Sequence, residues 1–152
     1  MAFTRDTYYA ALFERLQADV PGVVTWSRRH LKFSSLPASA QPAVFVVAAN
    51  QNAYMEPRCP TIWRLGVDVV GWVRATGQED TLDTVLNAII DSVEHALMSP
   101  TGTPGTLTTL GGLLQSMDFA GPIDINQREG GEEASFVIPL DMVVIGDAPG
   151  SG

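Results

Sequence analysis

The stretch IWRLGVDVVGWVRA, residues 62–75, decides the fold, because apolar and polar side chains alternate along it as they do in a half-buried β-strand. One face of the expected strand is apolar and carries Trp63, Leu65, Val67, Val69 and Val73. The other face is mixed and carries Arg64, Asp68, Val70, Trp72 and Arg74. Gly71 interrupts the apolar face, and we expect a β-bulge there.

Two helices, each with one apolar stripe, lie on either side of this strand in the sequence. The first is expected over residues 4–19, with Thr4 or Asp6 as its cap. The second is expected over residues 82–97, with Thr81 as its N-cap. An amphipathic helix packs its apolar stripe on another element, so both helices can share one face of a single sheet.

Further apolar runs predict four more strands, at residues 23–29, 43–49, 113–125 and 134–145. Residues 43–49 are apolar on both faces, which is typical of an interior strand. The polar residues 50–60 contain two prolines and are expected to form a loop. Because proline cannot donate to a sheet ladder, Pro139 predicts that the closing strand lies at a sheet edge or contains a bulge.

The order of these elements favours the α+β class over a parallel α/β fold, because most strands adjoin other strands in the sequence. A chain of 152 residues suffices for one core. We therefore expect one domain over residues 1–146 and a disordered tail, rich in glycine and proline, over residues 147–152.

Charge and hydropathy exclude several classes of protein. Nine basic and 17 acidic residues give a net charge of −8, which argues against a protein that coats nucleic acid or an anionic membrane. No apolar run approaches the roughly 20 residues of a membrane span. Residues 1–74 carry a net charge of +3 and residues 75–152 a net charge of −11. Such a division suits a protein that associates with its own copies, although solubility alone also accounts for it.

The sequence contains no catalytic or metal-binding pattern that stands out. His30 and His95 are far apart and have no partner at metal-ligand spacing. The single cysteine, Cys59, excludes an internal disulfide and a zinc site built from cysteines. The second helix carries a row of acidic residues, Asp83, Asp91 and Glu94. This row is either a solvated face of the helix or a magnesium site. We expect a protein that is not an enzyme and that has no cofactor and no metal.

Arginines and large aromatic residues, which concentrate at interfaces, mark candidate contact positions. Arg28 and Arg29 follow Trp26 in a basic cluster, where a subunit contact and nucleic-acid stacking are the two readings. Residues 50–60 and 126–133 are loops that we expect to contact partners. The full set of candidate subunit or partner contacts is Trp26, Arg28, Arg29, Tyr54, Arg58, Arg64, Trp72, Arg74, Asp91, Glu94 and Arg128.

Taken in order, eight segments between residues 3 and 145 resemble the tail terminator, or tail-completion, proteins of long-tailed bacteriophages, the minor tail protein U type. These segments are YYAALFERL, PGVVTWSRR, LPASAQPAVFVV, YMEPRCP, TIWRLGVDVVGWVRA, LNAIIDSVEHAL, TLGGLLQSMDFAGPIDI and FVIPLDMVV. The family brings no catalytic residues with it, so none is assigned here.

The resemblance implies a mixed, mainly antiparallel sheet with two helices packed against it, and a ring that is usually made of six copies. In that family the ring caps the head-proximal end of the tail tube, ends tube polymerisation and provides the surface for head–tail joining. Its partners would be other copies of the chain, the tail tube protein and a head-completion or neck protein. Genomic DNA would pass through without specific binding, and no membrane is involved. The location would be the virion tail at the head–tail junction, after assembly in the host cytoplasm.

Three other interpretations remain open at this point. The chain could be another neck or tail component, such as a head–tail joining protein or a tube subunit. It could be a magnesium-dependent enzyme that uses the acidic row of the second helix. It could also bind nucleic acid through residues 26–32, in which case its affinity would depend strongly on salt.

Overall fold

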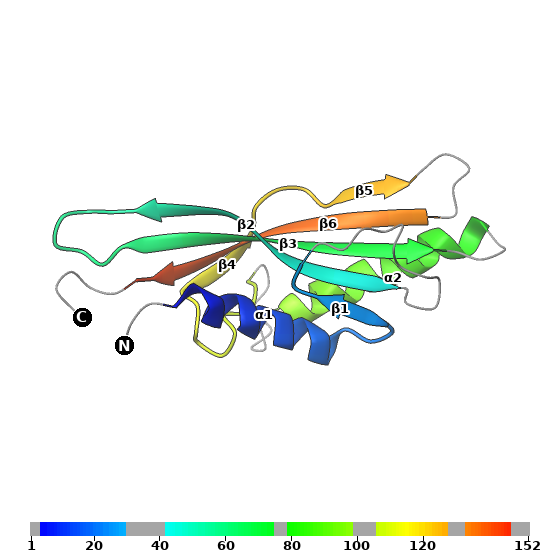
Figure 1. Cartoon of the computed structure of the whole chain (residues 1–152), viewed down its shortest axis with the longest axis horizontal. Coiled ribbons are helices and arrows are strands. Elements are labelled where there is room, and N and C mark those ends of the chain that lie inside the picture. Colours follow the sequence, from blue (N-terminus) through cyan, green and yellow to red (C-terminus); the bar gives the residue numbers. More distant parts are fainter. Residues whose placement is uncertain (1–3, 30–41, 75–78, 99–105, 128–132, 147–152) are drawn as a thin grey trace.

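The computed structural model describes residues 4–29, 42–74, 79–98, 106–127 and 133–146. Two helices and six strands follow one another in the order α1 (Arg5–Asp19), β1 (Thr25–Ser27), β2 (Ala43–Tyr54), β3 (Ile62–Arg74), α2 (Glu79–Leu97), β4 (Ser116–Phe119), β5 (Asp124–Gln127) and β6 (Glu133–Ile145). The strands form a single sheet, and both helices lie along the same side of it (Figure 1). The expected α+β class is confirmed.

The sheet has the order β1-β2-β3-β6-β4, and β5 also pairs with β6. β1 runs parallel to β2, whereas the other strand pairs are antiparallel. The sheet is therefore mixed and mainly antiparallel, as the resemblance implied. β3 and β6 pair in unbroken register from Ile62 opposite Ile145 to Arg74 opposite Glu133, so they form the spine of the fold.

The main core lies between the two helices and one face of the sheet, which we call the helix face. Its fully buried side chains come from both helices, β3 and β6, and include Leu12, Leu16, Leu65, Leu86, Val93 and Leu140. The alternation expected for residues 62–75 is correct, because Leu65, Val67 and Val69 all point into this core. The opposite face, which neither helix covers, is called the outer face and carries Asp68, Val70 and Trp72.

Some expected boundaries are wrong by a few residues. α2 begins at Glu79, so Thr81 lies inside the helix and is not its N-cap. Glutamate and aspartate at residues 79 and 80 are favourable in a first helical turn, because the helix dipole attracts negative charge there. Thr4 does occupy the N-cap of α1, but its side chain makes no capping hydrogen bond. The strand expected over residues 113–125 is divided into β4 and β5 by the bend at residues 120–123.

Gly71 does not mark a bulge, which corrects the expectation above. It pairs in regular register with Val44 on one side and Phe136 on the other. The ring of Phe136 covers it so closely that a Cβ atom would lie 2.0 Å from that ring. The glycine therefore makes room for a large core side chain on the neighbouring strand.

The expectation for the strand containing Pro139 is also wrong, because β6 lies inside the sheet and its register with β3 is regular at this residue. The carbonyl oxygen of Pro139 accepts a hydrogen bond from the Ala120 amide at 2.9 Å. The backbone nitrogen and oxygen of Pro139 therefore point toward β4 and β5, on the side of β6 away from β3. β4 ends at Phe119 and β5 begins at Asp124, so the missing amide falls where these strands are interrupted. The proline is tolerated because no ladder bond is lost there.

β2 is longer than expected and continues to Tyr54, because Gln51, Asn52 and Ala53 pair with β3. The polar composition of residues 50–54 therefore indicates exposure on both faces and does not indicate a loop. The register shifts between Ala48 and Gln51, where two β2 residues lie opposite Gly66. Such a bulge bends a strand and increases its twist. The true bulge of the hairpin is thus in β2 and not at Gly71.

No helix in the described part of the chain is long and apolar enough to cross a membrane. Residues 147–152, expected to be a disordered tail, lie outside the described residues, as does the segment 30–41, which contains His30.

Candidate interaction surfaces

The β2–β3 hairpin extends beyond the helical layer, and we call its outer part, residues 48–62, the arm. Figure 1 shows the arm projecting past both helices at one end of the molecule. Every residue from 48 to 60 is exposed, and Met55 at the turn is 73% exposed. An extended hairpin whose side chains stay exposed is a candidate contact surface.

The turn of the arm is ordered by local hydrogen bonds. The Tyr54 hydroxyl donates to the Glu56 carboxylate at 2.6 Å, and this bond raises the pKa of the Tyr54 phenol. The Cys59 amide donates to the Glu56 carbonyl at 3.1 Å. Arg58 adopts φ 65°, the left-handed conformation that turns use. Tyr54 and Arg58, two of the expected contact residues, therefore sit on a defined turn.

An apolar hollow lies on the outer face of the arm. Tyr54, Ile62 and Ile145 are cross-strand neighbours on β2, β3 and β6, and each is exposed. Together with Glu56, Cys59 and Pro60 they line a shallow hollow of about 190 Å³. Sequence reasoning did not identify the two isoleucines, because their pairing depends on the register of strands far apart in the chain.

The base of the arm is fixed to α1 by a polar network that sequence reasoning also missed. Tyr9 donates its hydroxyl to the Gly66 carbonyl at 3.1 Å and accepts a hydrogen bond from Gln51 Nε2 at 3.0 Å. Arg5 donates to Gln51 Oε1 at 2.8 Å, and its guanidinium lies 4.4 Å from the ring centroid of Trp63. Burial raises the pKa of Tyr9, although the hydrogen bond with Gln51 opposes this rise.

Gly66 is needed where this network meets the bulge. A Cβ atom on Gly66 would lie 2.4 Å from the backbone oxygen of Asn50. Only glycine lets the bulged segment of β2 approach β3 so closely. The direction of the arm is therefore set by a glycine contact on one face and by α1 on the other.

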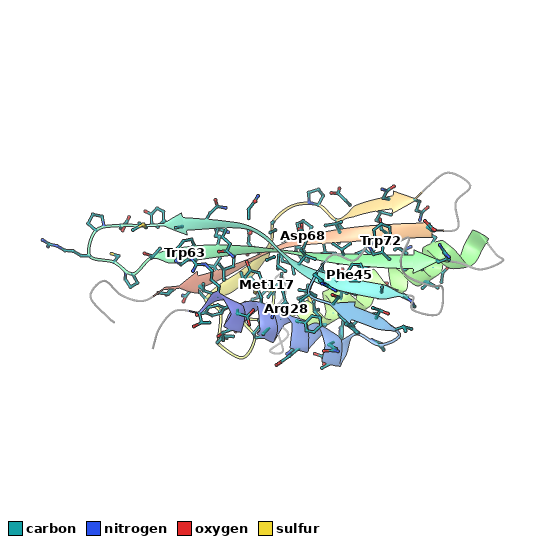
Figure 2. The ribbon with its side chains drawn as sticks, viewed as in Figure 1. Arg28, Phe45, Trp63, Asp68, Trp72 and Met117 are labelled. Carbon is teal, nitrogen blue, oxygen red and sulfur yellow. The ribbon has the colours of Figure 1, made fainter. Side chains whose placement is uncertain are left out.

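Three expected contact residues, Arg64, Trp72 and Arg74, lie on the outer face. Arg74 forms an ion pair with Glu133 at 2.6 Å, and Arg64 approaches Asp141 at 3.7 Å. Trp72 packs against a small apolar cluster that contains Phe45. Figure 2 labels Trp72 and Phe45 on neighbouring strands of the sheet. Both arginines thus have an acidic partner within the chain.

Asp68 lies on the same face, between Val47 and Pro139 on the adjacent strands. Figure 2 shows it near the centre of the sheet. Burial raises the pKa of this carboxyl group above its ordinary value, because water is partly excluded from it.

The basic cluster is only partly described. The ring of Trp26 packs edge-on against Phe13, with ring centroids 6.2 Å apart. Arg28 forms an ion pair with Asp6 at 2.7 Å, and the Arg28 guanidinium lowers the pKa of Asp6. Arg29 is exposed and its backbone amide donates to Ser27 Oγ at 3.2 Å. His30 and Lys32, which follow these arginines in the sequence, and Arg128 in the second expected loop lie outside the described residues.

The acidic row of α2 is exposed. Asp83 accepts hydrogen bonds from Asn87 at 3.4 Å and from Gln127, at the end of β5, at 3.0 Å. Asp91 and Glu94 are exposed on the polar face of the helix. Within the part of the chain that the structure describes, no three histidine, cysteine, aspartate or glutamate residues are grouped to hold a metal ion. His95 and Cys59 are both exposed and far apart in the sequence.

A second apolar surface, which we call the β4–β5 edge, was not expected. Phe119 and Ile125 lie opposite Leu140 and Phe136, which places them on the helix face at the margin of the sheet. Both remain exposed, Ile125 to 51%. Asp118 and Asp124 precede them, and residues 116–127 contain no basic side chain. In the sequence, the only local sign of this surface is that each of the two apolar residues directly follows an aspartate.

Comparison with known proteins identifies the fold. No family model matches the sequence, and no curated protein matches it either. Among solved structures, the fold is similar to that of a chain in the virion of a native gene transfer agent particle. The TM-score is 0.50 and the sequence identity 14%, over 91% of this chain and 94% of that chain. At this identity the likeness establishes the fold, and function has to be argued from the surfaces.

Proposed function

We propose that this chain is a structural protein of a phage-like virion that forms a ring of six copies at the head-proximal end of the tail tube. The ring ends polymerisation of the tube and offers its other side to a neck protein. In this role the chain is a tail terminator, acts by binding and carries out no reaction.

The observation that carries the proposal is the pair of exposed apolar surfaces, the arm and the β4–β5 edge, on a fold that also occurs in a virion particle. Two separate contact surfaces are what a subunit needs in order to bind identical neighbours on both sides. The likeness to the gene transfer agent chain covers 91% of this chain and 94% of that chain.

The charge of the chain supports the same role. A conduit for DNA has to let phosphates slide past, and a net charge of −8 disfavours tight binding to them. The expected partners are the tail tube protein, a head-completion or neck protein, and DNA that passes through without specific binding. The expected place of action is the head–tail junction, after assembly in the host cytoplasm.

Electron microscopy of the purified chain, alone and mixed with cognate tail tubes, tests the proposal. A terminator forms closed rings that sit at one end of each tube and prevent further growth from that end. A tube subunit would instead extend into open tubes, and a head–tail joining protein would bind the head vertex while leaving tube length unchanged. Either result would replace the terminator assignment.

A further inference from the structure

We propose that the arm of one copy docks on the β4–β5 edge of a second copy, so that neighbouring subunits overlap head to tail. This inference rests on the proposed ring and deepens it by naming the two surfaces that meet. The occupant of the apolar hollow on the arm is thus an apolar side chain from another copy of the same chain.

The position of the two surfaces fits such an overlap. The arm and β5 lie at opposite ends of the long axis of the molecule (Figure 1). The hollow on the arm opens on the outer face of the sheet, through Ile62 and Ile145, whereas Phe119 and Ile125 point to the helix face. The edge runs from β4, near the middle of the molecule, to β5, toward the end opposite the arm, and its apolar side chains face the other way from the hollow. Each subunit can therefore overlap the next one.

Both surfaces are apolar, and the arm has a hollow where the edge has exposed side chains. The hollow of about 190 Å³ is walled mainly by Tyr54, Ile62 and Ile145. Phe119 and Ile125 are large, exposed side chains on a strand margin, and each can enter a shallow apolar hollow. Docking would remove apolar side chains on both partners from water, which is the main source of affinity in protein association.

Charge complementarity favours a second copy over an unrelated partner. Arg58, at the tip of the arm, is exposed and makes no ion pair with any described residue. Asp118 and Asp124 alternate with Phe119 and Ile125 along β4 and β5, so they point to the outer face of the same margin, and neither makes an ion pair within the described ranges. Asp83 supplies a carboxylate on the helix face, the face of Ile125, because it is hydrogen-bonded to Gln127 at the end of β5. A cation therefore projects from the arm, whereas the edge carries Asp83 on the face of Ile125 and has no basic residue between 116 and 127.

Such a contact is heterologous, because the two sides of each interface use different residues. Every copy then offers one free arm and one free edge, and association continues until the rotation closes a ring. The arginines of the outer face, Arg64 and Arg74, are not needed for it, which agrees with their acidic partners inside the chain.

Mixing two complementary variants tests this arrangement. An arm variant, Met55→Asp with Ile62→Asp, and an edge variant, Phe119→Asp with Ile125→Asp, should each remain monomeric in sedimentation analysis. Mixed in equal amounts they should form a one-to-one dimer and stop, because only one intact arm and one intact edge remain. Val24→Asp, at an exposed apolar residue outside both surfaces, is the control and should assemble as the unmodified chain does.

An edge variant that assembles normally by itself overturns the proposal, as does an unmodified chain that stays monomeric at all concentrations. So does a mixture of the two variants that yields no dimer although each is folded by circular dichroism. If either double variant unfolds, exposed charges provide the test. Arg58→Glu should slow association about tenfold at low salt, and Asp83→Lys, added to the same chain, should restore most of that rate. A rate unchanged by Arg58→Glu contradicts the docking.

The outcomes also separate this inference from the proposed function. If the two variants complement each other but unmodified rings fail to bind tail tubes, the terminator role fails and the docking stands. If rings cap the tubes but the variants do not complement each other, the role stands and the docking fails.

Discussion

The two ends of the β2–β3 hairpin are held in different ways. At the inner end, Val44, Val46 and Val69 are buried under the helices. At the arm, every residue from 48 to 60 is exposed, and order depends on ladder pairing and on contacts from Arg5 and Tyr9. Burial of apolar surface dominates folding free energy, so the cost of a substitution should fall steadily from the inner end to the tip.

The largest difference between the two ends should appear with truncation of aromatic side chains. At the inner end, the ring of Phe136 on β6 packs on Gly71 of β3 and is fully buried. Phe136→Ala removes this ring and should lower the free energy of unfolding by about 3–5 kcal/mol. Tyr54→Ala at the arm should change it by no more than about 0.5 kcal/mol. Urea unfolding measures both. Equal losses would mean that the arm is part of the core and that the comparison is mistaken.

A smaller effect is expected for Gly71→Ala, because the new methyl group collides with the ring of Phe136. Overpacking of this kind should cost about 1–3 kcal/mol. Phe136→Leu should relieve the collision, so the double substitution should cost less than the sum of the single ones in a double-mutant cycle. Gly121→Ala, whose Cβ would lie an ordinary 3.7 Å from Pro139, is the matched control.

At the junction between the two ends, Tyr9→Phe deletes a hydroxyl that holds both Gly66 and Gln51. The free energy of unfolding should fall by about 1 kcal/mol, the usual net contribution of a hydrogen bond. Hydrogen exchange should quicken selectively at the amides of residues 49–54, because the base of the arm is released. Tyr54→Phe, which loses only an exposed hydrogen bond, should leave that exchange unchanged. Uniform acceleration over the whole chain would show that Tyr9 acts through global stability.

The smallest effect is expected for Asp68→Asn. Because burial raises the pKa of Asp68 in the folded chain, its charged form is disfavoured there relative to the unfolded chain. Stability should therefore fall as the pH rises through the region just above the ordinary carboxyl pKa, and stay lower above it. Asp68→Asn should remove this fall and be slightly more stable at neutral pH, with Asp118→Asn as the exposed control. Identical pH profiles for Asp68→Asn and the unmodified chain would contradict the assignment.

Local patterns were sufficient for most of the fold. Alternation in residues 62–75 and the two helical stripes correctly placed the core on one side of a sheet, because burial is periodic in both kinds of element. The same reasoning misread polar residues 50–54 as a loop, since a strand exposed on both faces leaves no apolar alternation. It also misread Gly71 and Pro139, whose roles depend on Phe136 and on the gap between β4 and β5.

The interaction surfaces were harder to predict for the same reason. Tyr54 and Arg58 could be named as candidates because their residue types and their turn are local features. Ile62, Ile145, Phe119 and Ile125 look like ordinary core residues in the sequence, and only strand register exposes them. The partners of Arg28, Arg64 and Arg74 are likewise set by tertiary structure, and whether these arginines also contact other subunits stays a prediction.

The interruption beside Pro139 has a consequence for solubility. A long, continuous margin of unpaired amides and carbonyls invites strands from other molecules to add to the sheet, and this is how fibrous aggregates grow. Here that margin is divided into β4 and β5, four residues each, with a bend between them and a proline behind the bend. A foreign strand finds no long template at this side, so the chain can expose apolar side chains there without aggregating through its backbone.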